Sequence, residues 1–399
     1  MQTVAINWHV YVLTHSALML GFVGLTRVIP VVLFSLVGGV VADRRDRRVV
    51  MFLTQGAMAI VSVALAILAF RRVDSVWLLY GLSALSASAS AFDNPARQAL
   101  IPRLVPFEDL PGALALNLTM FHAAMIGGPG LAGMVIGGAG LPTLSESTRL
   151  GILYGLNAVS FLGVLATLAT MHVSGAPDVR PEGHEPPLAA LRSGLRFVFT
   201  TPIMVATMAL DFFATFFSGA MSLLPIVADQ ILHVGARGYG WLVAAPAAGA
   251  VLGSLYTSVR PLPRRQGRVL LAAVVVYGIA TVTYGLSRSY WLTLLALAIT
   301  GLADLVSTVI RQTLRQLLTP DAMRGRMTSI NMIFFMGGPQ LGEMEAGLVA
   351  SLFASAALGV TVSVVSGGLL TVAAAAVVAL RSPHVRNYEG PTSVSYSTS

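Results

Sequence analysis

The sequence predicts an all-α membrane protein of twelve spans, arranged as two six-helix bundles. Three observations lead to this fold class: the composition is strongly apolar, long stretches carry no charge, and the basic residues fall in alternating loops. Of the 399 residues, 55% are hydrophobic and only 11% are charged. Soluble domains have about 25% charged residues, so the chain is expected to have a lipid bilayer as its surroundings.

Uncharged stretches give the number of spans. The stretches 49–70 and 110–145 run for 22 and 36 residues without Asp, Glu, Lys or Arg, and a helix crosses the hydrocarbon core with about 20 residues. The longest stretches therefore contain a turn. The predicted spans are 1–13, 18–41, 49–70, 75–96, 113–138, 150–171, 203–230, 239–259, 269–287, 290–311, 327–352 and 357–380.

The first predicted span is short. Residues 1–13 are too few to cross a bilayer, although Trp8 and Tyr11 suit an interfacial position. A signal peptide does not fit, because no basic segment precedes the apolar one and no small-residue cleavage site follows it. The sequence is therefore expected to begin part-way through a transmembrane helix.

Arginine sets the predicted orientation. Nineteen of the 25 arginines lie in one set of alternating loops, five lie in the other, and Arg27 lies inside a span. The positive-inside rule places the richer set in the cytoplasm. The C-terminus is then cytoplasmic, as is the Pro- and Gly-rich loop between the sixth and seventh spans.

This loop divides the chain into similar halves. The predicted parts are an N-terminal bundle (1–172), a linker (173–201), a C-terminal bundle (202–384) and a tail (385–399). A shift of 214 residues aligns Arg97 and Gln98 with Arg311 and Gln312, and Asn117 with Asn331. Two halves of like orientation form a parallel repeat, the architecture of major facilitator transporters.

Several functional classes are excluded by what the sequence lacks. It has no cysteine and no lysine, so thiolate metal sites and the phosphate-binding loop of ATPases are ruled out. No His, Asp or Glu cluster has metal-ligand spacing, and no nucleophile elbow is present. The arginines are dispersed between apolar blocks, unlike a nucleic-acid surface. We therefore expect no enzyme, no cofactor, no metal and no nucleic-acid partner.

The loop between the second and third spans carries the most specific pattern, Gly39-Val-Val-Ala-Asp43-Arg44-Arg45-Asp46-Arg47-Arg48. It resembles the signature loop of the major facilitator superfamily, except that Asp46 stands where the family has glycine. The resemblance implies a latch between the cytoplasmic ends of the two halves, made by Gly39, Asp43, Arg44 and Arg47. The alternative is that these arginines only set topology, although topology requires neither Gly39 nor Asp43.

A second pattern lies in the fifth span, Gly128-Pro129-Gly-Leu-Ala-Gly133. It resembles the motif of the exporter members of the superfamily, with Ala132 in place of one glycine, and so implies export. Proline removes a backbone hydrogen bond and bends the helix, and small residues allow close packing. The alternative is a packing kink at Pro129 without directional meaning.

Four further segments narrow the resemblance: Trp8–Tyr11, Asp93–Arg97, Leu104–Leu110 and Leu341–Gly347. Together they are similar to the bacterial branch of the superfamily that contains the enterobactin exporter and macrolide efflux pumps. This resemblance implies a multi-pass protein of the bacterial cytoplasmic (inner) membrane that works as a monomer on a small molecule and protons.

Charged residues inside spans are expensive and usually functional. Candidates for proton coupling or substrate binding are Arg27, Asp211, Asp304, Glu343 and Glu345. Arg27 and Asp211 could pair between the halves. Glu343 and Glu345 are two positions apart, about 200° around a helix, so only one of them is expected to face a translocation path.

Two further features have structural alternatives. Asp93 and Arg97, spaced i,i+4, are expected to form an ion pair on one helix face rather than a substrate site. His122 is expected to be a helix-packing residue rather than a proton relay.

The sequence therefore predicts a proton-coupled efflux transporter that exports an amphipathic small molecule, a siderophore or a drug such as a macrolide, by alternating access. A non-transporting membrane sensor on the same fold is one alternative, and a nutrient importer is another. A sensor needs no carboxylates in its spans, and the fifth-span motif argues against an importer.

Overall fold

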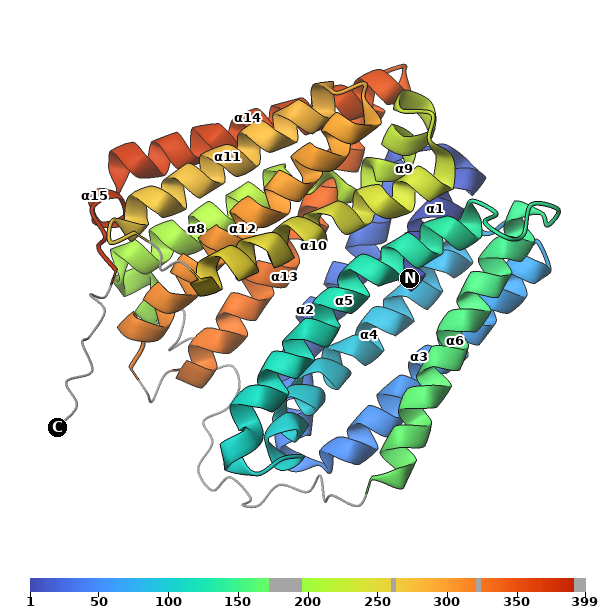
Figure 1. The fold of residues 1–399 in the computed structure, drawn as a ribbon, viewed down its shortest axis with the longest axis horizontal. Coiled ribbons are helices and arrows are strands. Elements are labelled where there is room, and N and C mark those ends of the chain that lie inside the picture. The colour runs from blue at the N-terminus through green and yellow to red at the C-terminus, as the bar shows by residue number, and fades with distance from the viewer. Residues whose placement is uncertain (172–195, 260–262, 321–323, 391–399) are drawn as a thin grey trace. The chain divides into compact units, whose positions relative to one another are not determined.

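The fold is described from a computed structural model, which covers residues 1–171, 196–259, 263–320 and 324–390. These residues form helices and no strands (Figure 1). Most of the predicted linker 173–201 lies outside the described residues. The chain divides into two compact units: unit 1 takes in 1–185, 219–244 and 340–360, and unit 2 takes in 186–218, 245–339 and 361–399. The predicted bundles 1–172 and 202–384 stay a prediction.

Unit 1 contains six long helices and several shorter segments. The long ones are α1 (Gln2–Thr14), α2 (Ala17–Arg44), α3 (Arg47–Phe70), α4 (Val76–Leu100), α5 (Leu110–Ile136) and α6 (Glu146–Thr170), with η1 (Ile101–Arg103) and η2 (Phe107–Asp109) between α4 and α5. The later segments are η3 (Ala220–Leu223), α9 (Leu224–Ile226), η4 (Val227–Ile231), α10 (Gly235–Val259) up to Ala244, α13 (Arg324–Ser351) from Gln340, and α14 (Ala356–Arg381) up to Val360.

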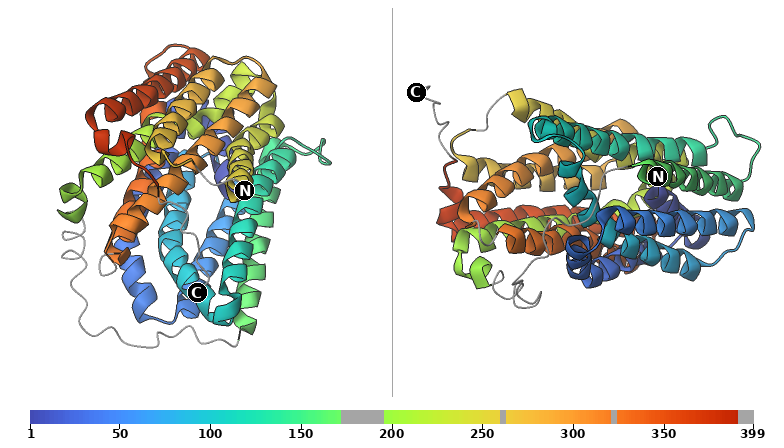
Figure 2. Two further views of the ribbon diagram at one scale, coloured as in Figure 1. Left: turned by 60° about the vertical axis from the view of Figure 1, so that its left-hand side comes forward. Right: turned by 90° about the horizontal axis from the view of Figure 1, so that it is seen from below.

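The helices of unit 1 pack in adjacent pairs. The most extensive contacts join α2 to α4, α3 to α6 and α3 to α4, and two views show α3 and α6 side by side (Figures 1 and 2). Buried Val50 and Met51 of α3 meet Ala96 and Leu100 of α4 and Leu168 of α6 in one apolar cluster. This packing holds the ends of α3, α4 and α6 together.

Side-chain caps explain where three of these helices begin. Ser16 accepts a hydrogen bond from the backbone N–H of Met19, and Ser145 accepts one from Thr148. Asp46 accepts one from Arg48 at 2.8 Å and so caps α3. An N-cap carboxylate satisfies an otherwise free backbone donor and suits the positive end of the helix. This gives a structural reason for an aspartate where the family has glycine.

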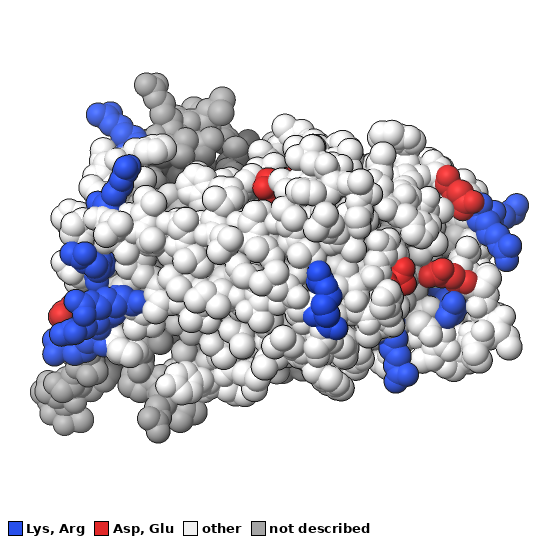
Figure 3. Space-filling model, turned by 90° about the horizontal axis from the view of Figure 1, so that it is seen from above, with Lys and Arg blue, Asp and Glu red and all other residues white. Residues whose placement is uncertain are grey.

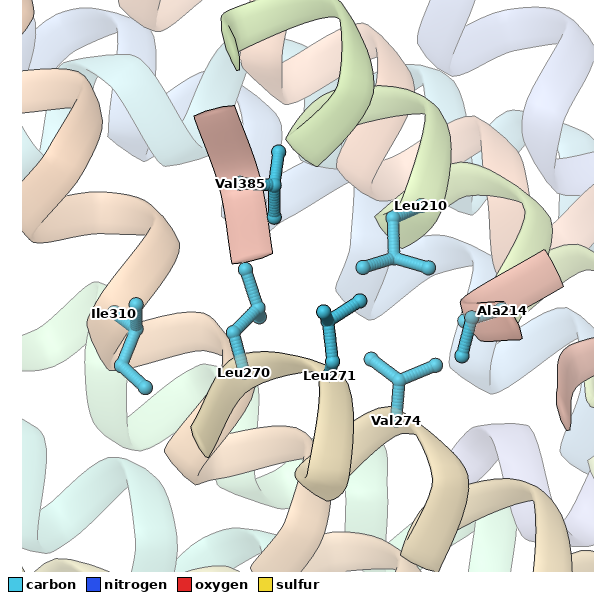
Figure 4. Packing of buried hydrophobic residues seen from close by; sticks show 8 residues of the cluster. Leu210, Ala214, Leu270, Leu271, Val274, Ile310 and Val385 are labelled. Atoms are coloured by element: carbon cyan, nitrogen blue, oxygen red, sulfur yellow. The ribbon is translucent and has the colours of Figure 1, made fainter. Parts of the chain in front are cut away.

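Unit 2 contains α8 (Pro202–Phe217), α11 (Gln266–Leu286), α12 (Tyr290–Leu318), α15 (Pro383–Arg386) and the remaining parts of α10, α13 and α14. Its largest described apolar cluster joins α8, α11, α12, α14 and α15 (Figure 4). Leu210, Leu271 and Val274 point toward one another there, and Val385 of α15 closes one side. Burial of such side chains fixes α8 against α11 and α12, and the site below depends on the packing of α8 beside α12.

Nine helices are long and apolar enough to cross a membrane, counting only the described residues. Their outward faces carry large apolar side chains, among them Leu53 and Ile60 of α3 at 66% and 71% exposure. Figure 3 shows arginine side chains in groups, separated by broad stretches of uncharged surface. Such a surface suits lipid and would be costly in water. The protein is a multi-pass membrane protein, as the sequence predicts.

The seventh predicted span, 203–230, is interrupted. The helix α8 ends at Phe217, and the chain continues through η3, α9 and the π-helical turn η4. Hydropathy does not reveal the break, because the residues on both sides of Ser218 are apolar. Helices α1 to α6 each lie within a few residues of their predicted spans.

Candidate functional site

The most strongly charged group of side chains within a predicted span lies in unit 2. Arg311 of α12 forms an ion pair with Asp211 of α8, and both side chains are nearly buried, at 10% and 13% exposure. The second carboxylate, on Asp304, lies 3.8 Å from the other terminal nitrogen of Arg311. The same nitrogen donates a hydrogen bond to Thr308 at 2.8 Å. One guanidinium therefore serves two carboxylates.

Helix geometry explains this arrangement. Asp304, Thr308 and Arg311 are spaced i, i+4 and i+7 along α12, so they share one face of the helix. This face is turned toward α8, where Asp211 is buried one turn before Ala214. The sequence predicts Asp304 and Arg311 on one face. Within unit 2, Asp211 pairs with Arg311; the suggested pairing with Arg27 stays a prediction.

These charges border a pocket within unit 2. Met204, Thr207, Met208 and Asp211 line it from α8, Thr308, Arg311, Gln312 and Arg315 from α12, and Asn331 from α13. Its wall combines two thioethers with charged and amide groups, so it offers both apolar and polar contacts. Methionine adapts its shape to different apolar partners.

A second group of polar side chains lies in unit 1. Arg27 of α2 and Glu343 of α13 each have a buried terminal atom, Nη2 and Oε2, without a hydrogen-bond partner in the described part of the chain. The Tyr239 hydroxyl and the Asn7 side-chain oxygen are also buried and also lack a hydrogen-bond partner of acceptable distance and angle among the described residues. Arg27 acts electrostatically on Glu343, and both act on Tyr239. The four side chains come from α1, α2, α10 and α13.

Glycines bring α2 and α13 into close contact beside these charges. A Cβ on Gly21 would lie 3.1 Å from Gly347 Cα, and one on Gly24 would lie 2.5 Å from the Gln340 carbonyl oxygen and 2.8 Å from Glu343 Cβ. Only glycine permits this approach, and it places Glu343 over the turn of α2 that precedes Arg27.

A hydrogen-bonded network on α1 is a feature that the sequence did not predict. The Trp8 indole donates to Glu146 Oε1 at 2.6 Å. The Tyr11 hydroxyl donates to Asp229 Oδ2 at 2.5 Å and accepts from Gln230 at 3.3 Å. Trp8 and Tyr11 were expected at a membrane interface, but both are buried, at 4% and 2% exposure. A buried Trp or Tyr usually forms a hydrogen bond with a polar partner. This general rule was the only indication in the sequence that Trp8 and Tyr11 could have such partners.

The Tyr11 contact leads to a stability prediction. Replacing Tyr11 with Phe removes the donor to Asp229 while keeping the ring, and hydrogen bonds to charged groups contribute about 1.5–3 kcal/mol. We expect a lower melting temperature for the detergent-solubilised Tyr11→Phe protein. Tyr256→Phe is the matched control, because Tyr256 is 63% exposed. Equal melting temperatures for the two variants would contradict this role for Tyr11.

The Asp93–Arg97 pair lies on α4 in unit 1. Arg97 contacts the Asp93 carboxylate as an i,i+4 ion pair. The same carboxylate accepts hydrogen bonds from Thr54 at 3.0 Å and from Gln55 at 2.9 Å, both on α3. Asp93 is 1% exposed. Its oxygens are therefore engaged in joining α3 to α4.

The predicted latch is described only in part. Gly39, Asp43 and Arg44 belong to α2, and their side chains lie outside the described residues. Arg47 donates to the Ala99 carbonyl oxygen at the end of α4, at 3.5 Å. Arg48 donates to the carbonyl oxygens of Leu168 and Ala169 at 2.7 and 2.9 Å. Positive charge suits these carbonyl groups at a helix C-terminus.

The fifth-span motif packs tightly against α10 within unit 1. A Cβ on Gly133 would lie 2.7 Å from Gly240 Cα, and one on Gly240 would lie 2.5 Å from the Pro129 carbonyl oxygen. Gly128 is close only to Met1, at 3.3 Å. The partner glycine on α10 was not predicted.

Two remaining candidates have few contacts. Glu345 is half-buried and makes no hydrogen bond or ion pair with a described residue, while His122 Nδ1 is buried without a partner there. No group of three or more His, Cys, Asp or Glu in the described ranges could hold a metal ion.

Comparison with known proteins decides the family. A family profile described as Transmembrane secretion effector matches residues 1–396. The chain belongs to this family of the major facilitator superfamily. Its curated relatives include the proteins named enterobactin exporter EntS of Shigella boydii serotype 18 (strain CDC 3083-94 / BS512) and Escherichia coli O81 (strain ED1a). Both are 27% identical over 337 residues, which cover 82% of this chain and 76% of each relative.

Solved structures agree on the fold of this family member. A bacterial homologue of the human lysosomal transporter Spinster, in an inward-facing and unoccupied conformation, superposes with a TM-score of 0.71 at 18% identity, covering 98% of this chain and 96% of that one. The nucleoside transporter NupG gives 0.69 at 13% identity, with 94% and 96% coverage. The protein thus has the major facilitator fold, and it is an inner-membrane transporter rather than an enzyme.

Proposed function

We propose that the protein is a proton-coupled efflux transporter that exports an amphipathic small molecule by alternating access. Its curated relatives named as an enterobactin exporter favour a siderophore as the substrate. A drug such as a macrolide is the second candidate, favoured by the two methionines in the wall of the unit 2 pocket. In this proposal the transporter is a monomer with a cytoplasmic C-terminus.

One observation carries the proton coupling: a nearly buried Asp211–Arg311 pair borders a pocket, with Asp304 3.8 Å from the same guanidinium. Two carboxylates that share one cation are an arrangement in which a proton on one changes the pairing of the other. Proton uptake would therefore change how Arg311 divides its contacts between α8 and α12. A sensor has no need of such a site.

In this proposal the signature-like loop and the fifth-span motif account for the conformational change and for the direction of transport. Gly39, Asp43, Arg44 and Arg47 would latch the cytoplasmic ends of the halves. Gly128, Pro129 and Gly133 would allow the helices to repack as the transporter changes state. Release of the substrate on the non-cytoplasmic side makes the protein an exporter; an importer would run the same cycle in reverse.

The experiment is substrate-triggered proton movement in proteoliposomes that enclose a pH-sensitive dye, with enterobactin and a macrolide supplied separately. The wild-type protein is expected to move protons with one of them, and Asp211→Asn and Asp304→Asn to reduce this movement at least about tenfold, as for loss of an acid–base group. The matched control is Glu389→Gln, an exposed carboxylate beyond α15. Wild-type proton movement in both variants would contradict the proposal.

A further inference from the structure

Ten buried side-chain atoms of unit 1 have no hydrogen-bond partner among the described residues. Four of them belong to side chains that interact electrostatically or lie next to one another: Asn7 Oδ1, Arg27 Nη2, Tyr239 Oη and Glu343 Oε2. Asn7 is 5% exposed and Tyr239 is fully buried. Buried polar atoms in proteins are nearly always paired. Four unpaired ones in one place indicate a site made to pair with something else.

Pairwise interactions connect the four groups. The Asn7 amide lies next to the Tyr239 hydroxyl, and the charges of Arg27 and Glu343 both act on this hydroxyl. Arg27 also acts on Glu343. Nevertheless, no ion pair or hydrogen bond joins the guanidinium to the carboxylate. Opposite charges that are near each other but unpaired in a nonpolar environment need a partner between them.

The surrounding helices hold these groups in place. Gly24 allows Glu343 to approach α2, since a Cβ there would lie 3.0 Å from Glu343 Oε2. The Tyr239 ring is stacked on Trp8, with centroids 5.4 Å apart and an interplanar angle of 27°. Trp8 is itself held by Glu146. The unpaired atoms are therefore on supported side chains, and the two rings offer an apolar wall.

The chemistry of the four atoms defines the occupant. Arg27 and the Tyr239 hydroxyl supply donors, whereas Glu343 and Asn7 supply acceptors. Arginine matches a carboxylate, and a carboxylate matches an ammonium group. The protein side carries one charge of each sign, so an occupant with one charge of each sign pairs both and adds no net charge to the interior.

We propose that Asn7, Arg27, Tyr239 and Glu343 bind a zwitterionic group of the amino-acid type. Its carboxylate pairs with Arg27 and Tyr239, and its ammonium group pairs with Glu343 and Asn7. An aromatic or aliphatic part beside it packs on Trp8. The inference goes beyond the proposed function: neither enterobactin nor a macrolide carries such a zwitterion, so this is a binding site separate from that of the exported molecule.

The test is equilibrium binding to the purified, detergent-solubilised full chain, without a membrane or a proton gradient. Four probes share one phenyl ring: phenylalanine, phenylacetate, phenethylamine and 2-phenylethanol. Phenylalanine is expected to bind about tenfold or more tightly than each of the others, since a hydrogen bond to a charged group is worth at least that factor. Equal binding by 2-phenylethanol, or no binding of phenylalanine by folded protein, overturns the proposal.

Single variants test which residue pairs with the carboxylate of phenylalanine and which pairs with its ammonium group. Arg27→Gln should make phenylalanine bind no better than phenethylamine, and Glu343→Gln should make it bind no better than phenylacetate. Arg268→Gln, an exposed arginine on α11, is the control. Tyr239→Phe keeps the stacking on Trp8 and removes only the hydroxyl next to Asn7. It should therefore weaken phenylalanine binding by a larger factor than it weakens the binding of phenethylamine, which lacks the carboxylate.

The two proposals can fail separately. Selective phenylalanine binding without proton movement in proteoliposomes would leave this site in place and refute proton coupling. Proton movement driven by enterobactin or a macrolide, with no selectivity among the four probes, would refute the zwitterion site alone.

Discussion

Replacing Arg311 with glutamine is expected to destabilise the protein strongly. The substitution leaves two carboxylates, Asp211 and Asp304, without their shared cation. Removing one partner of a buried ion pair costs about 3–5 kcal/mol, because the remaining charge stays buried and unpaired. We expect Arg311→Gln to show a markedly lower melting temperature in detergent and little folded protein in the membrane.

Asp211→Asn is expected to lower the melting temperature less than Arg311→Gln does. Asp211→Asn keeps an amide that Arg311 can contact, and Arg311 retains Asp304 and the hydrogen bond to Thr308. Its melting temperature should lie between those of the wild type and Arg311→Gln. Combining Asp211→Asn with Arg311→Gln should recover part of the loss, since the double variant no longer buries the uncompensated charge of Asp211. A double variant with the full sum of both losses would show that the two residues act independently.

The sequence predicts this site only in part. It identifies Asp211 and Asp304 because a carboxylate within a span is rare and costly, and it places Asp304 and Arg311 on one face because their spacing is seven. It does not predict that Asp211 faces Arg311, which is 100 residues further along the chain. That contact depends on how α8 packs against α12, and packing is set by the shapes of many apolar side chains.

The unit 1 site shows the same limit more clearly. Arg27 and Glu343 are predicted, since each charge interrupts an apolar stretch. Asn7 and Tyr239 are not, because uncharged polar residues are common in spans and usually bond to neighbouring helices. Only the close approach of α2 to α13 at Gly21, and the stacking of Tyr239 on Trp8, bring these four residues together.

Helix positions, in contrast, follow closely from hydropathy. The predicted span 49–70 becomes Arg47–Phe70, and 357–380 becomes Ala356–Arg381. A bilayer imposes a length and an apolar composition on each crossing, and both can be read from a single sequence. Hydropathy does not predict the break after α8, because an interruption within the apolar layer changes the backbone hydrogen bonds without changing the apolar composition of the segment.

Replacing Gly240 with alanine is the second substitution with a large expected effect. The new Cβ would lie 2.5 Å from the Pro129 carbonyl oxygen and 2.7 Å from Gly133 Cα, both of which belong to the α5 backbone. Backbone atoms cannot move away by a change of rotamer as a flexible side chain can, so α5 and α10 must separate. Overpacking of this kind costs about 1–3 kcal/mol, and Gly133→Ala should have the same effect from the other helix.

Gly127→Ala is the matched control, because a Cβ at Gly127 meets nothing within 4 Å. This substitution should be neutral or stabilise α5 by up to about 1 kcal/mol, since alanine favours a helix over glycine. Melting temperatures of the three variants in detergent, followed by transport assays, provide the comparison. If Gly127→Ala were as damaging as Gly240→Ala, bending of α5 at Pro129 would explain the motif better than its contact with α10. If only Gly133→Ala and Gly240→Ala are damaging, the glycine of the exporter-like motif is required because another helix backbone occupies the space of its side chain.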